Sequence, residues 1–537
     1  MKLLRKFPLT IVIVIIISLM GSLMIYFSTY WGPWAFSDSV EYIVSARNLL
    51  AGHGLGLYGP SGTFHPLSLH PPFYSLVLSF VGLFGADLVT TARWIDVSLF
   101  GLTILLVGIA LYTSTQSAWL PIIVSFMLFS MPDLVDIFSG AMSEPLFIFT
   151  GLAGISLILL FLRNNRYIVL LAAALFSGLS ILTRYSGLSF IITGIICLLV
   201  FSQRPWKSRI PSILIYGVVS CLPIIGWLIW LKIQSLSAST FLFTTNISEQ
   251  ISKLRLGIMG IFWSWLPFTS LLPRYTYNLA RNLLIIFIFL MLILLIVSAW
   301  KMHQNNMKVI HSSNGLLFAG SLIVFAIAFL FVFCFSYLFT YPTPDLNSRI
   351  ILPVQVAAVI AIFLLFLFFI RAWPSLKWLN LIPIFLSLGI SISYLHDSIE
   401  IVSKYHQFGS GYTSRNWRKS GTILLVEQLS PNIPIITNET ALVLLYTGRP
   451  AYEISELVDR EPQDITNRYG DDLNDPAQIA FRENGAALVL FSSSIWEFQQ
   501  LYGDQASHRL ENFTRGLFLY AHTADGLIYF YPSTTLP

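Results

Sequence analysis

Residues 8–27 read PLTIVIVIIISLMGSLMIYF and contain no charged side chain. A membrane-crossing helix needs about 20 apolar residues, so this run is long enough to span a bilayer. The basic stretch 1–6 precedes it, and the aromatic stretch 30–34 follows it. A secretory signal peptide has a shorter apolar core and a small-residue cleavage site. We therefore expect a retained membrane helix whose N-terminus is cytoplasmic.

The composition of the whole chain agrees with a membrane protein. The chain has 537 residues, of which 55% are hydrophobic and 11% are charged, and its mean hydropathy is +0.74. Soluble domains carry about 25% charged residues. Cys197, Cys221 and Cys334 all lie in apolar runs, so neither a disulfide framework nor a zinc site is indicated. The net charge of +5 comes from scattered basic residues, and we expect no nucleic-acid partner.

Ten further apolar runs follow, which gives about eleven expected membrane helices in a mainly α-helical, polytopic bundle. The runs lie near residues 92–112, 118–132, 144–162, 167–183, 187–202, 210–231, 282–300, 316–340, 349–370 and 376–396. With the N-terminus inside, nearly every inward loop is basic, as the positive-inside rule requires. We expect a multi-pass plasma-membrane protein whose C-terminal part is extracytoplasmic. The short apolar stretch 72–84 is expected to lie against the outer face.

Residues 398–537 have a different character, with many charges and turn residues and no run of membrane length. Residues 433–437 and 486–491 are typical of strands, and residues 439–446 of a short helix. Residues 517–522 and 527–531 flank a turn and indicate a hairpin. We therefore divide the chain into a transmembrane domain, 1–397, with a long outer loop at 29–91, and a small extracytoplasmic α/β domain, 398–537. The small domain is expected to bind an acceptor or to cap the structure.

Acids and arginines gather in the loops expected on the outer side. The candidates are Asp38, Glu41, His53, His65 and His70, then Asp133, Asp136 and Glu144, then Arg184 and Tyr185, then Trp263, Trp265, Arg274 and Tyr275, and finally Asp345 and Arg349. Charged groups close to a bilayer are costly and tend to be functional. Ordinary solvated loop charge is the alternative for each of them, and Asp38 has the further alternative of capping the helix that follows it.

Several short motifs carry a family resemblance. Asp38-Ser39-Val40-Glu41-Tyr42, His70-Pro71-Pro72-Phe73-Tyr74, Ser143-Glu144-Pro145-Leu146, the stretch 178–188 and the stretch 347–353 occur in this order. Together they resemble the GT-C glycosyltransferases, in the branch that holds protein O-mannosyltransferases and lipid A aminoarabinose transferases. The resemblance covers about residues 8–400. The tail, with Ser414-Arg415-Asn416-Trp417-Arg418, is similar to that of uncharacterised membrane proteins of this branch.

The resemblance implies a sugar donor on a polyprenyl phosphate, with inverting transfer at the outer face of the membrane. Asp38 would then be the general base, and Glu144 would be a second catalytic residue. Arg184, Arg349 and His70 would hold the donor phosphate. His70 stands where the aminoarabinose branch has lysine, which weakens its phosphate role. The further substrate-binding candidates are Glu41, Tyr42, Asp133 and Tyr185. For each arginine, an ion pair with Asp133, Asp136 or Glu144 is an equal alternative.

Other questions stay open at the level of sequence. No cofactor is required, although oxygen ligands such as Asp38 and Glu144 would suit a divalent Mg or Mn ion. The partners expected are the lipid-linked donor, membrane lipid and an acceptor that is a glycan, a lipid or a protein. A transporter or flippase of lipid-linked sugars is the competing function, but no internal repeat is evident. A non-catalytic envelope-assembly protein is the third alternative.

Overall fold

The computed structural model describes residues 8–234, 236, 240–241, 247–265, 282, 314–341, 346–372, 381–457 and 475–532. Contacts divide the chain into two compact units. The first, here called the bundle unit, comprises Met1–Tyr30, Ser68–Tyr74 and Ala92–Gln407. The second, here called the sheet unit, comprises Trp31–Leu67, Ser75–Thr91 and Phe408–Pro537. The predicted α-helical membrane bundle and the predicted C-terminal α/β region are both present.

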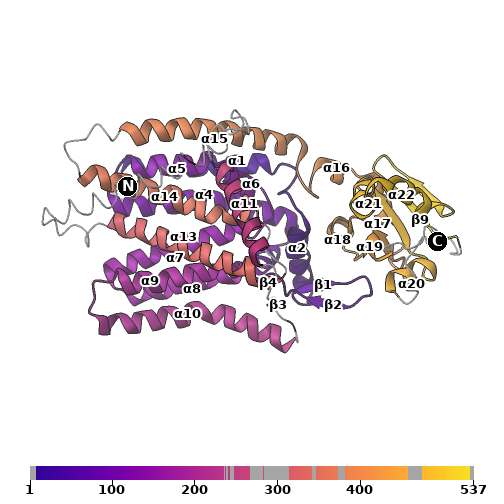
Figure 1. Ribbon diagram of the computed structural model, residues 1–537, viewed down its shortest axis with the longest axis horizontal. Coiled ribbons are helices and arrows are strands. Elements are labelled where there is room, and N and C mark those ends of the chain that lie inside the picture. The colour runs from indigo at the N-terminus through magenta and orange to yellow at the C-terminus, as the bar shows by residue number, and fades with distance from the viewer. Residues whose placement is uncertain are drawn as a thin grey trace. The chain divides into compact units, whose positions relative to one another are not determined.

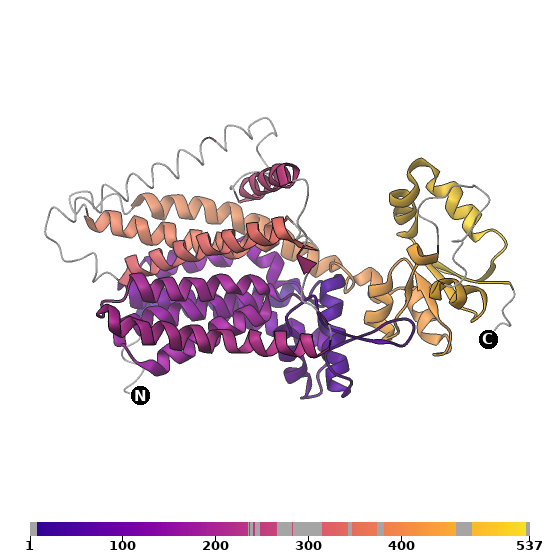
Figure 2. The same cartoon turned by 60° about the horizontal axis from the view of Figure 1, so that its bottom comes forward.

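The bundle unit consists almost entirely of helices. Its elements are α1 (Leu9–Ser28), α4 (Leu88–Thr115, from Ala92 onward), α5 (Leu120–Ser130), α6 (Pro132–Phe138), α7 (Glu144–Asn164), α8 (Tyr167–Thr183), η2 (Tyr185–Gly187), α9 (Leu188–Val200), α10 (Trp206–Ile233), β3 (Thr240–Phe241), α11 (Ile247–Ser264), α13 (Asn314–Phe339), β4 (Thr340–Tyr341), α14 (Ser348–Ala372) and α15 (Leu381–Phe408). Strands β3 and β4 pair antiparallel. The long helices α7, α8, α9, α10, α13 and α14 run alongside one another in both views (Figure 1, Figure 2).

Seven helices of the described residues are long and apolar enough to cross a membrane, or eight if the bent pair α5 and α6 is one span. The expected spans near 167–183 and 187–202 correspond to the shorter apolar helices α8 and α9. The expected span near 282–300 lies outside the described residues. The stretch 72–84 forms the ten-residue helix α3 (Phe73–Gly82). The number eleven therefore stays a prediction.

The expected span near 118–132 is broken rather than straight. Helices α5 and α6 meet at an angle of 63°. Met131 between them is extended, with φ −76° and ψ 114°. Proline disfavours the helical conformation in the residue before it, and Pro132 opens α6. The break therefore follows from one residue, which also turns the acids of α6 away from the axis of α5.

Small residues let the bundle helices approach closely. A Cβ on Gly151 of α7 would lie 1.9 Å from the ring of Phe190 on α9, so only glycine fits there. The Phe190 ring in turn stacks on Phe325 of α13, with centroids 4.2 Å apart and planes inclined by 13°. Tyr216 of α10 donates a hydrogen bond to Ser177 of α8 at 2.8 Å. Small residues and interhelical hydrogen bonds of this kind are what hold helices together in lipid.

The sheet unit joins the first outer loop to the C-terminal residues. Its elements are α2 (Ser37–Leu50), β1 (Gly56–Tyr58), β2 (Phe64–Pro66), most of α3, α16 (Arg415–Arg418), α17 (Gly421–Gln428), β5 (Ile435–Thr437), α18 (Thr440–Thr447), β6 (Tyr452–Glu453), α19 (Ile454–Leu457), α20 (Pro476–Arg482), β7 (Ala487–Phe491), α21 (Ser494–Tyr502), η6 (Gly503–Gln505), α22 (Ala506–Thr514), β8 (Phe518–His522) and β9 (Gly526–Phe530). Strands β1 and β2 form a small antiparallel hairpin.

The main sheet has the strand order β6-β5-β7-β9-β8. Strand β5 is parallel to both β6 and β7, whereas β9 is antiparallel to β7 and β8. The predicted strands at 433–437 and 486–491, the helix at 439–446 and the hairpin at 517–531 correspond to β5, β7, α18 and the β8–β9 pair. Periodicity located these elements because each strand is short, apolar and bounded by turn residues.

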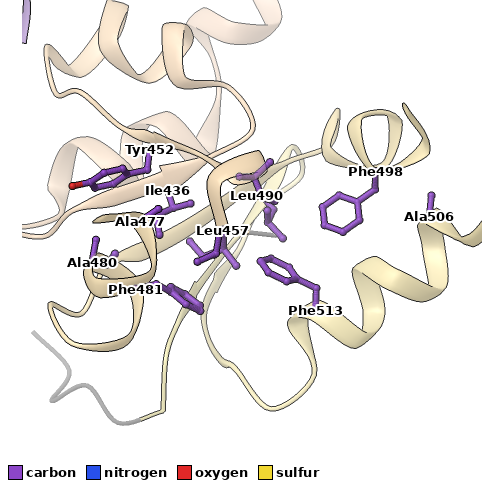
Figure 3. Packing of buried hydrophobic residues seen from close by; sticks show 13 residues of the cluster. Ile436, Tyr452, Leu457, Ala477, Ala480, Phe481, Leu490, Phe498, Ala506 and Phe513 are labelled. Atoms are coloured by element: carbon purple, nitrogen blue, oxygen red, sulfur yellow. The ribbon is translucent and has the colours of Figure 1, made fainter. Parts of the chain in front are cut away.

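Side chains of β7 alternate between two apolar cores, one on each face of the sheet. Ala487, Val489 and Phe491 pack with α17 and α18 on one face. Leu488 and Leu490 pack on the other face (Figure 3), together with Leu457, Phe481, Phe498 and Phe513 from helices α19 to α22. Successive side chains of a strand point to opposite faces, so a strand covered on both sides is a continuous apolar run. All five residues of β7 are buried, as this rule requires.

Hydrogen bonds to backbone carbonyls connect the loop after α1 with the C-terminal residues of the sheet unit. The Tyr412 N–H donates to the Ala35 carbonyl at 2.8 Å. The Thr413 hydroxyl donates to the Pro33 carbonyl at 2.7 Å. Farther along α2, Arg47 donates to the Leu445 carbonyl of α18 at 3.3 Å. Helix α2 therefore groups with residues 408 onward. Helix α15 extends to Phe408, past the boundary expected at residue 397.

Candidate functional site

An arginine–glutamate cluster lies within the bundle unit. Arg184 Nη1 is 2.8 Å from Glu144 Oε1, and Arg349 Nε is 3.2 Å from the same oxygen. The Glu144 side chain is 2% exposed, whereas each arginine side chain is 22% exposed. The acid is therefore buried beneath two guanidinium groups that still reach solvent. The three side chains carry a net charge of +1.

Helix ends place these three residues. Glu144 is the first residue of α7, Arg184 directly follows α8, and Arg349 is the second residue of α14. An acid at a helix N-terminus and a base at a C-terminus both interact favourably with the helix dipole. Ser143, just before α7, accepts a hydrogen bond from Arg184 Nη1 at 3.2 Å. The dipoles of α7 and α8 thus favour Glu144 and Arg184, whereas Arg349, in the first turn of α14, is held by its ion pair with Glu144.

Tyr185 extends the cluster along the chain. Its hydroxyl accepts a hydrogen bond from Trp227 Nε1 at 3.2 Å and donates to the Ser68 carbonyl at 3.4 Å. Trp227 stacks on Trp230 of α10, with centroids 4.8 Å apart. Ser68 begins the segment Ser68–Tyr74, which belongs to the bundle unit and contains the half-buried His70. Tyr185 therefore fixes the position of the His70 segment relative to α10.

The acids of α6 are bound to neighbouring helices. The Asp133 carboxylate lies close to the side chains of Ser348 and Gln355 of α14. Tyr405 of α15 donates to Asp136 Oδ1 at 2.6 Å. Because Ser348 directly precedes Arg349, Asp133 is linked to the start of the same helix that supplies one arginine of the cluster. Among the described residues, the ion pairs of Arg184 and Arg349 are with Glu144 and not with these two acids.

Asp38 and Glu41 lie in the sheet unit, on the first turns of α2. Phe36 occupies the N-cap position, and its N–H donates to the Ser39 hydroxyl at 3.2 Å. Asp38 therefore stands inside the first turn and not at the N-cap. Burial, and next the negative charge of Asp38, raise the pKa of Glu41 from 4.5 to about 7. Residues three apart share a helix face, so the two carboxyl groups lie close to each other.

The remaining candidates are placed as follows. Tyr42 is a core residue of the sheet unit, since it is 2% exposed and its carbonyl accepts a hydrogen bond from Ser75 at 3.2 Å. His53 precedes the β1–β2 hairpin, and His65 is the middle residue of β2, where it is exposed and contacts Thr63 at 2.9 Å. Arg274, Tyr275 and Asp345 lie outside the described residues. The structure thus brings Glu144, Arg184 and Arg349 together, and the ion pair considered as an alternative for each arginine is present.

Asp96, in the middle of α4, is not among the candidate residues that the sequence indicated. This side chain is 0% exposed, and neither of its carboxylate oxygens has a hydrogen-bond partner among the described residues. The charge of Glu144 acts on it electrostatically. A buried polar group without a partner is rare in folded proteins and calls for an explanation. The sequence signal for Asp96 is a single acid inside an apolar run.

A metal site needs several ligating side chains close together. The described residues contain no group of three or more His, Cys, Asp or Glu side chains that could hold an ion. The single carboxylate of the cluster, Glu144, is a poor metal ligand, because it is already paired with two guanidinium groups. No metal ligand is therefore assigned in the part of the chain that the structure describes.

Comparison with solved structures identifies the architecture. ArnT from Cupriavidus metallidurans, bound to undecaprenyl phosphate, aligns with a TM-score of 0.55 at 13% identity, over 96% of this chain and 97% of that chain. The Archaeoglobus fulgidus oligosaccharyltransferase, in complex with zinc and sulfate, aligns with the same score and identity over 96% of this chain and 73% of that chain. The chain has the GT-C fold. No protein-family model and no curated protein matches the sequence.

The GT-C fold confirms the architecture that the motifs of the sequence indicated. A third structure of this fold, AglB from Archaeoglobus fulgidus in complex with an inhibitory peptide and a dolichol-phosphate, aligns with a TM-score of 0.50 at 11% identity, over 98% of this chain and 74% of that chain. Two of these three GT-C structures hold a polyprenyl-type phosphate lipid. At identities this low, the alignments establish the fold. The roles of individual residues are inferred from their chemistry.

Proposed function

We propose that this chain is an inverting glycosyltransferase that moves a sugar from a polyprenyl-phosphate donor to an acceptor at the outer face of the membrane. The observation that carries the proposal is the arginine–glutamate cluster in a bundle with the GT-C fold. Its net charge of +1 and its partly exposed guanidinium groups suit an anionic phosphate. Glu144 would position the two arginines, since its carboxylate is already engaged with both.

The chemistry needs two groups besides the phosphate. Asp38 would accept the proton of an acceptor hydroxyl as the oxygen attacks the anomeric carbon. The bond from that carbon to the phosphate oxygen breaks in the same step, and its electron pair stays on the phosphate. Arg184 and Arg349 would stabilise the charge that develops there, so no acid needs to protonate the leaving group. Glu41, with its raised pKa, would be partly neutral near pH 7 and would limit the negative charge beside Asp38.

The experiment uses the full-length protein in detergent with polyprenyl-phosphate sugars, and it measures donor affinity and the release of free polyprenyl phosphate. Asp38→Asn should bind donor normally and lose about 10²–10⁴-fold in turnover, because asparagine cannot take the proton. Arg349→Ala should weaken donor binding as well as turnover. Asp87→Asn is the matched control, since Asp87 accepts the Thr90 N–H at 3.0 Å in the same unit and belongs to no candidate site.

Two outcomes would contradict the proposal. Near-normal turnover of Asp38→Asn would leave Asp38 without a catalytic role and would direct the search for the base to Glu41. Undiminished donor affinity in both Arg184→Ala and Arg349→Ala would make the cluster a purely structural ion pair. Transport of intact lipid-linked sugar across vesicles without release of polyprenyl phosphate would favour the flippase alternative.

A further inference from the structure

The sheet unit carries a basic–aromatic patch that consists of Trp31, Arg415, Arg418 and Lys419, here called the Trp31 patch. Arg415 Cζ lies 6.0 Å and Lys419 Nζ 5.9 Å from the centroid of the Trp31 ring. A cation within about 6 Å of an indole face is attracted by the electron density of the ring. Two positive charges thus lie within about 6 Å of the Trp31 ring.

Among the residues that the structure describes, no carboxylate forms an ion pair with these charges. Arg415, Arg418 and Lys419 are all exposed. Within the described ranges of the chain, none of the three forms an ion pair with an acid. Arg418 donates from Nε to the Thr413 carbonyl at 3.3 Å, which fixes its position without neutralising it. Three cations without a counter-charge repel one another, so an anion that contacts all of them would be bound favourably.

The chain itself places this patch at the membrane surface. Trp31 is three residues beyond the end of α1 at Ser28, and Arg415 is seven residues beyond the end of α15 at Phe408. Both helices are among those long and apolar enough to span a bilayer. The Ala35–Gly411 bridge ties the two emerging segments together. Three residues reach at most about 10 Å, so Trp31 lies at headgroup level, where tryptophan is enriched.

We propose that the Trp31 patch binds the phosphate headgroup of an anionic membrane phospholipid. Each guanidinium can hold phosphate oxygens by two hydrogen bonds, and the lysine adds a point charge. The indole would lie among the glycerol and headgroup atoms. Such a lipid would anchor the segment that leads to Asp38, seven residues farther along the chain. Lipid binding at the Trp31 patch does not depend on glycosyl transfer. Its test is therefore independent of the test of the proposed function.

The test measures lipid binding to the full-length protein by native mass spectrometry. Detergent-solubilised protein is titrated with dioleoyl phosphatidylglycerol and, separately, with dioleoyl phosphatidylcholine. Each basic residue near a membrane surface contributes about 1 kcal/mol, or about fivefold in affinity. The double variant Arg415→Gln, Lys419→Gln should therefore lose about 25-fold in phosphatidylglycerol affinity and keep its weak phosphatidylcholine binding. Trp31→Leu should lose less, since all three charges remain.

Arg509→Gln is the matched control. Arg509 Cζ also lies over an aromatic ring of the sheet unit, 5.5 Å from the centroid of Tyr502. Its lipid affinity should equal that of the wild type. Thermal unfolding in phosphatidylcholine micelles checks that each variant is folded, and the single variants replace the double variant if it is not.

Three results would overturn the proposal. The first is a wild type that binds both lipids equally. The second is a phosphatidylglycerol affinity that falls as much in Arg509→Gln as in the double variant. The third is complete displacement of the lipid by millimolar inorganic phosphate, which would make the patch a site for free phosphate.

Discussion

Glu41→Gln is expected to stabilise the protein at pH 8 and to leave its stability unchanged at pH 4. Burial and the neighbouring charge of Asp38 raise the pKa of Glu41 from 4.5 to about 7 in the folded protein. At pH 4 the side chain is protonated in both the folded and the unfolded chain. Between pH 4.5 and 7 the folded chain keeps a proton that the unfolded chain releases, so the free energy of unfolding falls as pH rises.

The size of this effect follows from the pKa values. One pKa unit corresponds to about 1.4 kcal/mol. Raising the pKa of Glu41 from 4.5 to about 7 therefore costs at most about 3 kcal/mol once the group is ionised. Glu41 keeps partial access to solvent, which screens its charge, so we expect about 1–2 kcal/mol at pH 8. Glutamine resembles the neutral acid in shape and hydrogen bonding, and it cannot ionise.

The assay is thermal unfolding of the full-length protein in detergent at pH 4, 6 and 8. The difference in Tm between Glu41→Gln and the wild type should be near zero at pH 4 and should reach about 2–4 °C at pH 8. Asp38→Asn should make the difference smaller and let it level off at a lower pH, because it removes one of the two causes that raise the pKa of Glu41. Glu483→Gln, at an exposed position, is the control. A Tm gain of equal size at pH 4 and pH 8 would refute the reasoning.

Three further predictions concern the bundle and the orientation of the chain. Glu144→Gln leaves two guanidinium groups without their shared anion and should lower the free energy of unfolding by about 3 kcal/mol. An unchanged Tm would show that the cluster is solvated. Asp96→Leu removes two buried oxygens that have no hydrogen-bond partner among the described residues. It should therefore raise the free energy of unfolding by about 1–3 kcal/mol. A lower Tm would show that the carboxyl group has a stabilising partner. Ser507→Cys, exposed in the sheet unit, should react with an impermeant maleimide in intact cells, whereas reaction only after lysis would reverse the proposed topology.

The sequence by itself determined which segments enter the membrane and which fold as an α/β sheet. A long apolar run has a large free energy of transfer into lipid wherever it occurs in the chain, so α1, α7 and α14 can be located without knowledge of their neighbours. The continuous apolar run of β7 likewise shows that both of its faces are covered. Even the break at Met131 is a local effect of Pro132. The same reasoning selected Glu144, Arg184 and Arg349, because each is a charge beside an apolar run.

Tertiary structure decided how these residues are combined. Glu144 could have paired with neither arginine or with one, and the ion pairs depend on which helix ends meet when the bundle packs. Helix α2 groups with the C-terminal residues because Ala35, Pro33 and Arg47 form hydrogen bonds with Tyr412, Thr413 and Leu445 there. Asp96 gains its significance only from being fully buried. Transfer free energy and periodicity are properties of a segment, whereas the cost of a charge depends on every group around it, and only the folded chain brings those groups together.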